Sequence, residues 1–133
     1  GEYISLDWIQ GSKGRFGVTR RFPLGPVLGI TPFNFPLNLV AHKVAPAIAA
    51  GNPVVLKPAS STPLCSLALG EILLEAGLPP EAVSVLPSKA SLAETMVSEE
   101  RFKLFSFTGS ADVGWRLKGL AGKKRGGVCP FGA

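Results

Sequence analysis

The chain has 133 residues, of which 46% are apolar and 17% are charged. This composition allows one domain with a buried core and excludes a wholly disordered chain. No apolar run approaches the roughly 18 residues that span a bilayer, and no charged start followed by an apolar run marks a secretory signal. We therefore expect a protein that has no membrane partner.

The cysteines, the histidine and the charges narrow the class of site. Cys65 and Cys129 are too few for a disulfide scaffold, which favours a reducing compartment and predicts a cytoplasmic location. They lie far apart, and His42 has no acidic or cysteine neighbour, so no metal site is expected. The net charge of +5 arises from basic residues near both ends. These could attract phosphate, but a solvated face is the preferred interpretation, and no nucleic-acid partner is predicted.

Residues 1–24 are predicted to form a β-hairpin. Tyr3 and Ile9 belong to an apolar extended segment, residues 11–14 form a glycine-containing turn, and a second strand passes through Phe16 and Val18. A hairpin of two strands is marginal by itself, so we expect it to pack on something.

From residue 25 to residue 125 the pattern alternates between strands and helices. Short apolar runs predict buried strands at residues 27–30, 53–57, 83–86 and 104–107. Apolar residues at helical spacing follow each of them. Pro46 should kink or shorten the first helix, which ends at Gly51. Residues 126–133 show no pattern and are expected to form an irregular tail.

Three of the helices have predicted caps. Thr62 is an expected N-cap for the second helix, Ser91 with Glu94 has the spacing of a capping box, and Ser110 can cap a fourth helix that ends at Gly122. The predicted core stripe of the second helix consists of Leu64, Leu67, Ala68 and Ile72.

Four strand–helix repeats predict an α/β fold, a Rossmann-like doubly wound parallel sheet with a leading β-hairpin. Ligands of such sheets bind at the carboxyl ends of the strands, which selects the turns at residues 31–36, 57–62 and 108–110. The usual glycine-rich dinucleotide fingerprint, the phosphate loop and the GxSxG motif are all absent.

The polar residues of these turns each allow two interpretations. Asn34 could donate hydrogen bonds to an oxyanion or cap the following helix, and its chemistry alone favours the cap. Lys57 could reach solvent or hold a hydroxyl or phosphate group, with equal support. Gly109 and Ser110 open a helix, where the backbone N–H groups could bind an anion or simply be capped.

Four segments in register resemble the aldehyde dehydrogenase superfamily. They are GPVLGITPFNFP at residues 25–36, PAIAAGN at 46–52, VLKPA at 55–59, and FTGS with the following Val113-Gly114 pair at 107–114. The resemblance covers about residues 11 to 124. It implies a cofactor-binding portion of an enzyme that oxidises an aldehyde to an acid through a cysteine thioester, with hydride passing to NAD or NADP.

The resemblance also implies roles for single residues. Asn34 matches an asparagine that holds the oxyanion, which replaces the cap interpretation. Lys57 matches a lysine that binds hydroxyls of the adenosine ribose, and Gly109 with Ser110 matches the helix start beneath the pyrophosphate. The expected remaining contacts with the cofactor are Ile30, Thr31, Pro32, Phe33, Ser60 and Val113. The hairpin matches a bridging and oligomerisation region, which implies a homo-oligomer.

Two departures from the family pattern bear on the cofactor and on activity. Ser60 stands where many NAD-preferring members have a glutamate, and serine does not repel a 2′-phosphate, so we lean toward NADP with Lys57 and Lys89 as phosphate partners. The Glu-Leu-Gly-Gly segment is absent, and Cys129 lies too early to be the nucleophile, so the chain alone is expected to be inactive. The alternative is a non-catalytic nucleotide-binding module.

Overall fold

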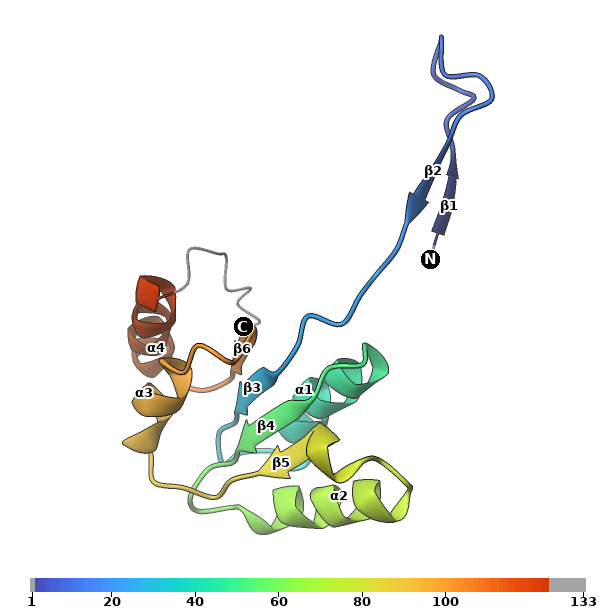
Figure 1. Cartoon of the computed structure of the whole chain (residues 1–133). Coiled ribbons are helices and arrows are strands. Elements are labelled where there is room, and N and C mark those ends of the chain that lie inside the picture. The colour runs from blue at the N-terminus through green and yellow to red at the C-terminus, as the bar shows by residue number, and fades with distance from the viewer. Residues whose placement is uncertain (1, 125–133) are drawn as a thin grey trace.

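A parallel sheet of four short strands lies at the centre of the α/β body (Figure 1). The computed structural model describes residues 2–124, and their side chains as far as residue 122. The order across the sheet is β5-β4-β3-β6. These strands are β3 (Val27–Ile30), β4 (Val54–Lys57), β5 (Val83–Val85) and β6 (Leu104–Phe107).

The predicted strands are confirmed because each is a run of apolar residues that the sheet buries. All four residues of β3, the central strand that pairs with β4 and β6, are buried. A strand covered on both faces needs such an unbroken run. The ends differ slightly from the prediction, since Pro53 and Leu86 lie just outside the strands.

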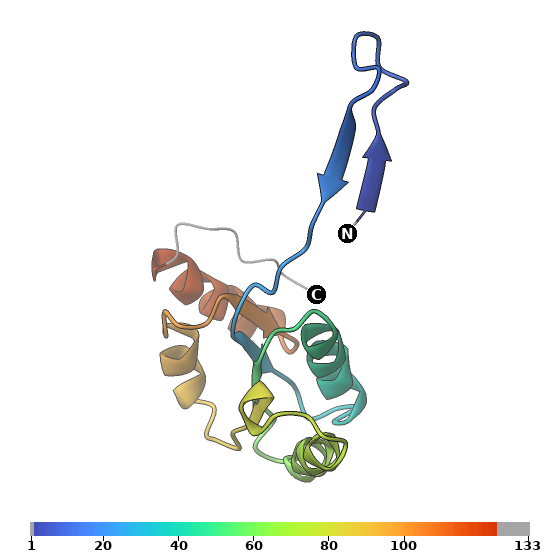
Figure 2. The ribbon, with the colours of Figure 1, turned by 45° about the vertical axis from the view of Figure 1, so that its right-hand side comes forward.

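Helices cover both faces of the sheet, which confirms the doubly wound α/β architecture (Figure 2). One apolar cluster joins the first pair of helices to one face, and a second cluster joins the other pair to the opposite face. A short 3-10 turn, η1 (Pro80–Ala82), precedes β5. The helices are α1 (Asn38–Ala49) and α2 (Leu64–Glu75) on one face, and α3 (Leu92–Val97) and α4 (Ala111–Lys124) on the other.

The helix α1 runs through Pro46, so of the two predicted effects of this proline, a kink or a shortened helix, the shortening does not occur. The chain leaves α1 at Gly51, whose positive φ of 75° favours glycine. The side-chain oxygen of Asn52 then accepts hydrogen bonds from the backbone N–H groups of Leu24 at 2.6 Å and Gly25 at 2.9 Å. This contact fixes the entry to β3 against the connection between α1 and β4.

Two predicted caps are wrong. The N-cap of α2 is Pro63, and the Thr62 hydroxyl is buried without a hydrogen-bond partner. Ser91 occupies the N-cap position of α3, but the predicted capping box does not form, because its backbone is helical (φ −60°, ψ −27°) and its hydroxyl makes no capping hydrogen bond. The carboxylate of Glu94 instead forms an ion pair with Arg116 of α4 at 3.3 Å. The contact between α3 and α4 therefore uses the side chain on which the capping box depends.

The buried face of α2 also differs from the prediction. Leu69 and Leu73 pack against the core, and Ser66 is buried. The predicted stripe points to solvent instead, with Leu64 76% and Ile72 59% exposed. This helix is apolar on nearly all sides, so periodicity does not identify its inner face.

The hairpin projects from the α/β body (Figure 1). Its strands β1 (Glu2–Ser5) and β2 (Phe16–Thr19) pair antiparallel. The predicted first strand extended to Ile9, but residues 7–10 form turns because the Asp7 carboxylate accepts a hydrogen bond from the Gly14 N–H at 2.9 Å. Tyr3 and Phe16 stack with their ring centroids 5.8 Å apart, yet both stay exposed.

At the other end of the chain, α4 continues to Lys124, so the predicted end at Gly122 is wrong. The predicted irregular tail at residues 126–133 lies outside the described residues.

Candidate functional site

The strand order reverses between β3 and β6. The chain proceeds from β3 outward to β4 and β5, and then returns to place β6 on the other side of β3. In an open parallel sheet, the carboxyl ends of the strands at such a reversal border a crevice where ligands bind. Thr108 extends this edge, since its N–H donates to the carbonyl of Ile30 at 3.1 Å, while the Thr31 N–H donates to the carbonyl of Lys57 at 3.2 Å.

The turn after β3 passes from buried to exposed residues. Ile30 and Thr31 are buried and Pro32 is half-buried, whereas Phe33, Asn34 and Phe35 are exposed. The φ of Phe35 is 48°, a left-handed conformation that costs a side-chain-bearing residue about 1–3 kcal/mol.

Asn34 does not cap the following helix. The helix α1 begins at Asn38, its N-cap is Leu37, and no side chain makes a capping bond there. The interpretation of Asn34 as a cap is therefore wrong, and its amide group lies exposed at the carboxyl edge of the sheet.

Lys57 ends β4 and is only 4% exposed. The interpretation in which its amine reaches bulk solvent is therefore wrong. Its Nζ donates to the carbonyl of Pro58 at a long 3.4 Å, the one hydrogen bond of this amine shown among residues 2–122. Burial lowers the pKa of Lys57 below its usual value of 10.5. An ammonium has three N–H donors, so this amine can also serve ligand hydroxyl groups.

Ser60 connects two of the predicted turns. Its hydroxyl donates to the carbonyl of Ser88 at 3.0 Å, which joins the turn after β4 to the turn after β5. The Ser88 hydroxyl is buried without a partner, and Lys89 next to it is exposed. The structure thus places Ser60 and Lys89 on adjoining turns at this edge.

The turn from β6 into α4 places backbone N–H groups at the same edge. Gly109 and Ser110 are exposed, and the Ser110 carbonyl accepts from the Gly114 N–H at 3.0 Å as the helix begins. A Cβ on Gly109 would come within 2.6 Å of the Phe107 ring, so a larger residue there would require this ring to move. Val113 packs in the first turn of α4 against the core. The first turn of α4 therefore has the free N–H groups that attract an anion.

Sequence reasoning missed Lys43. This residue of α1 is only 8% exposed, and its Nζ donates to the hydroxyl of Thr108 at 2.7 Å and to the hydroxyl of Ser106 at 3.2 Å. Burial lowers the pKa of Lys43 below its usual value of 10.5. The signal was present, because Lys43 falls on the same helical stripe as Val40 and Val44, where a charged residue is unexpected.

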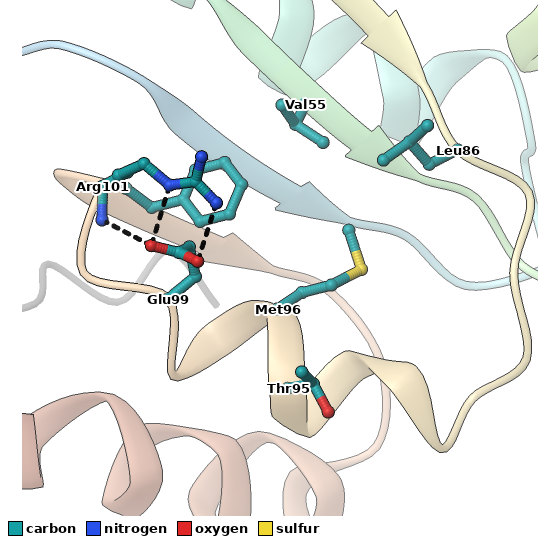
Figure 3. Close-up of a pocket in the computed structure, with 7 residues that line it drawn as sticks. Val55, Leu86, Thr95, Met96, Glu99 and Arg101 are labelled. Carbon is teal, nitrogen blue, oxygen red and sulfur yellow. Dashed lines mark hydrogen bonds and ion pairs between the residues drawn. The ribbon is translucent and has the colours of Figure 1, made fainter.

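A separate cavity of about 420 Å³ lies on the face of the sheet beside α3 (Figure 3). Its walls include Val55, Leu86 and Met96, and the ion pair between Glu99 and Arg101 lies at its rim. None of the residues that line it belongs to the predicted site.

Two findings concern other kinds of site. Over residues 2–124, no helix has both the length and the apolar character that a membrane crossing requires. In the same part of the chain, no group of three or more histidine, cysteine, aspartate or glutamate side chains is placed to hold a metal ion.

A doubly wound parallel sheet with polar turns at its strand reversal defines a class of α/β proteins that bind a ligand at that edge. The family model described as the aldehyde dehydrogenase family matches residues 2–128. The 3-sulfolactaldehyde dehydrogenase of Priestia aryabhattai is 44% identical over 126 residues, which are 94% of this chain and 26% of that protein. The chain belongs to the aldehyde dehydrogenase family.

Solved structures agree with this membership. Aldehyde dehydrogenase 21 from Physcomitrella patens, in complex with the reaction product succinate, is 53% identical with a TM-score of 0.82, over all of this chain and 28% of that one. Glyceraldehyde-3-phosphate dehydrogenase from Methanocaldococcus jannaschii, complexed with NADP, is 42% identical with a TM-score of 0.73, and the match covers 80% of this chain and 24% of that one. An NAD-dependent benzaldehyde dehydrogenase from Corynebacterium glutamicum is 43% identical with a TM-score of 0.76, and the match covers 85% of this chain and 24% of that one. The chain therefore spans about a quarter of the length of the proteins it matches.

Proposed function

We propose that this chain carries the NAD(P)-binding half-site of an enzyme that oxidises an aldehyde to a carboxylic acid. The observation that carries the proposal is the meeting of two features at one edge of the sheet, namely the buried amine of Lys57 and the exposed N–H groups that open α4. One feature suits hydroxyl groups, and the other suits a phosphate. Because the chain spans about a quarter of its relatives, we assign the reaction to the whole protein.

We assign the cofactor contacts along this edge. Lys57 would donate to hydroxyls of the adenosine ribose, with Ser60 nearby, and the N–H groups at Gly109 and Ser110 would hold the pyrophosphate. The wall beside the cofactor would consist of Ile30, Thr31, Pro32 and Phe33, with Val113 in the first turn of α4. The cofactor would accept the hydride, while these residues bind and orient it.

Asn34 is proposed as the hydrogen-bond donor to the oxyanion that forms when the aldehyde is attacked. Its amide is exposed at the edge of the sheet and is not used as a helix cap. The left-handed backbone at Phe35 supports a functional reason for the shape of this turn, because such strain is concentrated at functional sites. An amide N–H aimed at a developing negative charge lowers the barrier to the reaction.

We favour NADP over NAD as the cofactor. Both occur among related enzymes, since one similar structure is a complex with NADP and another is named as NAD-dependent. Ser60 carries no charge that would repel a 2′-phosphate, and Lys89 lies exposed on the adjoining turn. A cationic pair of Lys57 and Lys89 would then attract the extra phosphate.

The assignments beyond the half-site are also proposals. Residues 1–24 would form part of a bridging region that supports a homo-oligomer, and residues 25–125 would form part of the cofactor domain. A chain with two cysteines suits a reducing compartment such as the cytoplasm.

The test is a calorimetric titration of the chain with NADP and with NAD. Lys57→Ala should weaken NADP binding by about tenfold or more, the loss expected for a hydrogen bond to a charged donor. Lys13→Ala is the matched control, because it removes one exposed lysine in the turn of the hairpin. Equal affinity of the Lys57 and Lys13 variants, or no saturable binding by the parent chain, would refute the half-site. We expect no oxidation of aldehydes by the chain alone.

A further inference from the structure

Lys43 is a charged residue in a place that the core normally reserves for apolar side chains. It projects from the buried stripe of α1, between Val40 and Val44. Its two hydrogen-bond partners are neutral hydroxyl groups, and the ion pairs shown among residues 2–122 do not include it. Burying an ammonium without a carboxylate costs free energy, so its position calls for a function.

The α1 face of the sheet has space for the Lys43 side chain to lie across strand β3. Gly29 in β3 lies under the stem of Lys43, because a Cβ built on Gly29 would be 3.4 Å from Cδ of Lys43 and 3.2 Å from a methyl group of Leu56. The backbone of Gly29 is not in a left-handed conformation, so glycine provides space here rather than conformational freedom. The aliphatic stem crosses the central strand at the one residue that has no side chain.

The ammonium group of Lys43 lies beside β6, the strand that pairs with β3 on the edge opposite to β4. Ser106 pairs with Gly29 in the register, so its side chain lies directly beside the crossing point. Thr108 follows two residues later and faces the same way, because side chains alternate along an extended chain. The ammonium therefore binds the Ser106 hydroxyl on the α1 face of β6 and the Thr108 hydroxyl just beyond the end of that strand.

The chemistry of these hydrogen bonds has a direction. An ammonium can only donate, so the oxygen atoms of Ser106 and Thr108 are acceptors and each hydroxyl keeps its own proton to donate elsewhere. The Thr108 hydroxyl is half-buried and stands immediately before Gly109 and Ser110, where α4 opens. Lys43 thus fixes the orientation of a hydroxyl at the carboxyl edge.

We propose that Lys43 is a positioning residue, which holds the turn of Thr108, Gly109 and Ser110 in the shape that binds the phosphate groups of the cofactor. This inference rests on the proposed function of the same edge as a dinucleotide site. Its buried positive charge lies behind the turn and complements an anionic ligand in front of it. An anion at the turn offsets part of the free energy that the buried charge costs the unliganded chain.

The test uses Lys43→Met, which keeps an apolar stem and removes the ammonium. We expect NADP to bind about tenfold more weakly, whereas the control Lys13→Met, with the same loss of charge, stays within about twofold of the parent chain. Urea unfolding should show that Lys43→Met is as stable as the parent or more so, since replacing a buried charge with an apolar side chain often stabilises. A purely structural role predicts the opposite pair of results, with lower stability and unchanged affinity of the folded protein.

Thr108→Val gives an independent measurement. If Lys43 acts through the Thr108 hydroxyl, Thr108→Val should also weaken NADP binding, and the double variant should bind no more weakly than Lys43→Met alone. Additive losses in the double variant would overturn the proposed route through Thr108. Affinity of Lys43→Met within about twofold of Lys13→Met would overturn the role of Lys43 itself.

A third measurement separates this proposal from the proposed function. Amide hydrogen exchange without any cofactor should be faster in Lys43→Met than in Lys13→Met at Thr108 and Gly114, whose N–H groups donate to Ile30 at 3.1 Å and to Ser110 at 3.0 Å, while α2 exchanges at the same rate in both variants. If the parent chain binds no cofactor, the half-site proposal fails, and exchange at Thr108 and Gly114 still decides whether Lys43 holds the turn. Unchanged exchange there would overturn the inference.

Discussion

Lys43 and Lys57 are both buried lysines, yet they differ in what their amines meet. Lys43 donates to two hydroxyls at 2.7 and 3.2 Å, while Lys57 donates to one carbonyl at 3.4 Å. Burial lowers the pKa of both amines, because the low-dielectric interior disfavours the charged form. We assign Lys43, which has the shorter hydrogen bonds, to positioning the turn after β6. We assign Lys57, which has one long hydrogen bond, to binding a ligand.

Neither lysine could be placed from the sequence alone. The apolar run before Lys57 correctly predicted that it ends a strand, but its burial depends on the turns around it. Lys43 stands out in the sequence as a charge on an apolar stripe, but its partners cannot be identified there, because they lie more than 60 residues away. The pairing of Gly29 with Ser106 also joins residues that are far apart in the sequence. Contacts that depend on strand register across the whole sheet leave no local pattern.

Glu99 should affect stability at low pH. The side-chain hydrogen bond from Arg101, followed by a backbone hydrogen bond from the same residue, lowers the pKa of Glu99 from 4.5 to about 2. A depressed carboxyl pKa stabilises the fold above the unfolded-state value, and this contribution is lost as pH falls from 4.5 toward 2. Glu99→Gln should therefore make the unfolding free energy depend less steeply on pH in that range.

Acid titrations of unfolding by urea would measure this effect. Glu100→Gln, which removes a neighbouring exposed carboxylate, is the control. Since both side chains of the Glu99–Arg101 pair are in contact with solvent, the effect should be small and should shrink as salt is added. Identical slopes for the parent and Glu99→Gln would contradict the assignment.

At the scale of the elements, apolar runs predicted the strands well, whereas capping residues and periodicity predicted the helix caps and the buried face of α2 poorly. The four strands of the sheet are where their apolar runs lie, because a buried parallel strand needs such a run. The capping box at Ser91 lacks its reciprocal partner for a tertiary reason, since the Glu94 carboxylate forms an ion pair with Arg116 on another helix. A local capping motif cannot show such a competing partner.

The two faces of α2 give a direct test of the packing. Leu73 packs against the core, and Leu73→Ala should lower the unfolding free energy by about 2 kcal/mol through lost burial and a cavity. Ile72, its neighbour in the same helix, is 59% exposed, and Ile72→Ala should change the unfolding free energy by less than about 0.5 kcal/mol. Chemical denaturation of both variants measures the difference. A larger loss of unfolding free energy for Ile72→Ala than for Leu73→Ala would mean that α2 buries the face predicted from the sequence.

At the scale of the whole molecule, the hairpin presents apolar surface outside the α/β body (Figure 2). Tyr3 is 69% and Phe16 is 63% exposed, and large apolar surface of this kind marks sites of association. The edges of a two-stranded ribbon can also pair with another chain. We therefore propose that copies of the chain associate through the hairpin.

Sedimentation velocity over a range of concentrations tests this association. Phe16→Ser should shift the distribution toward the monomer, because it removes half of the exposed Tyr3–Phe16 stack. Phe33→Ser, with a similarly exposed phenylalanine on the turn after β3, is the matched comparison. A monomer at every concentration would contradict the prediction. A stronger effect of Phe33→Ser would show that the chains associate through the edge of the sheet and not through the hairpin.

The order of strands has a consequence for the growing chain on the ribosome. The unit of β3, α1 and β4 is complete once residue 57 has been synthesised, and the Asn52 side chain can already secure its entry. The second neighbour of β3 is β6, which does not exist until residues 104–107 are made. Throughout that interval, the central strand of the finished sheet is an edge strand with unpaired backbone groups. A nascent chain that stalls in this interval presents β3 to other chains, and binding there by a chaperone would protect it until β6 arrives.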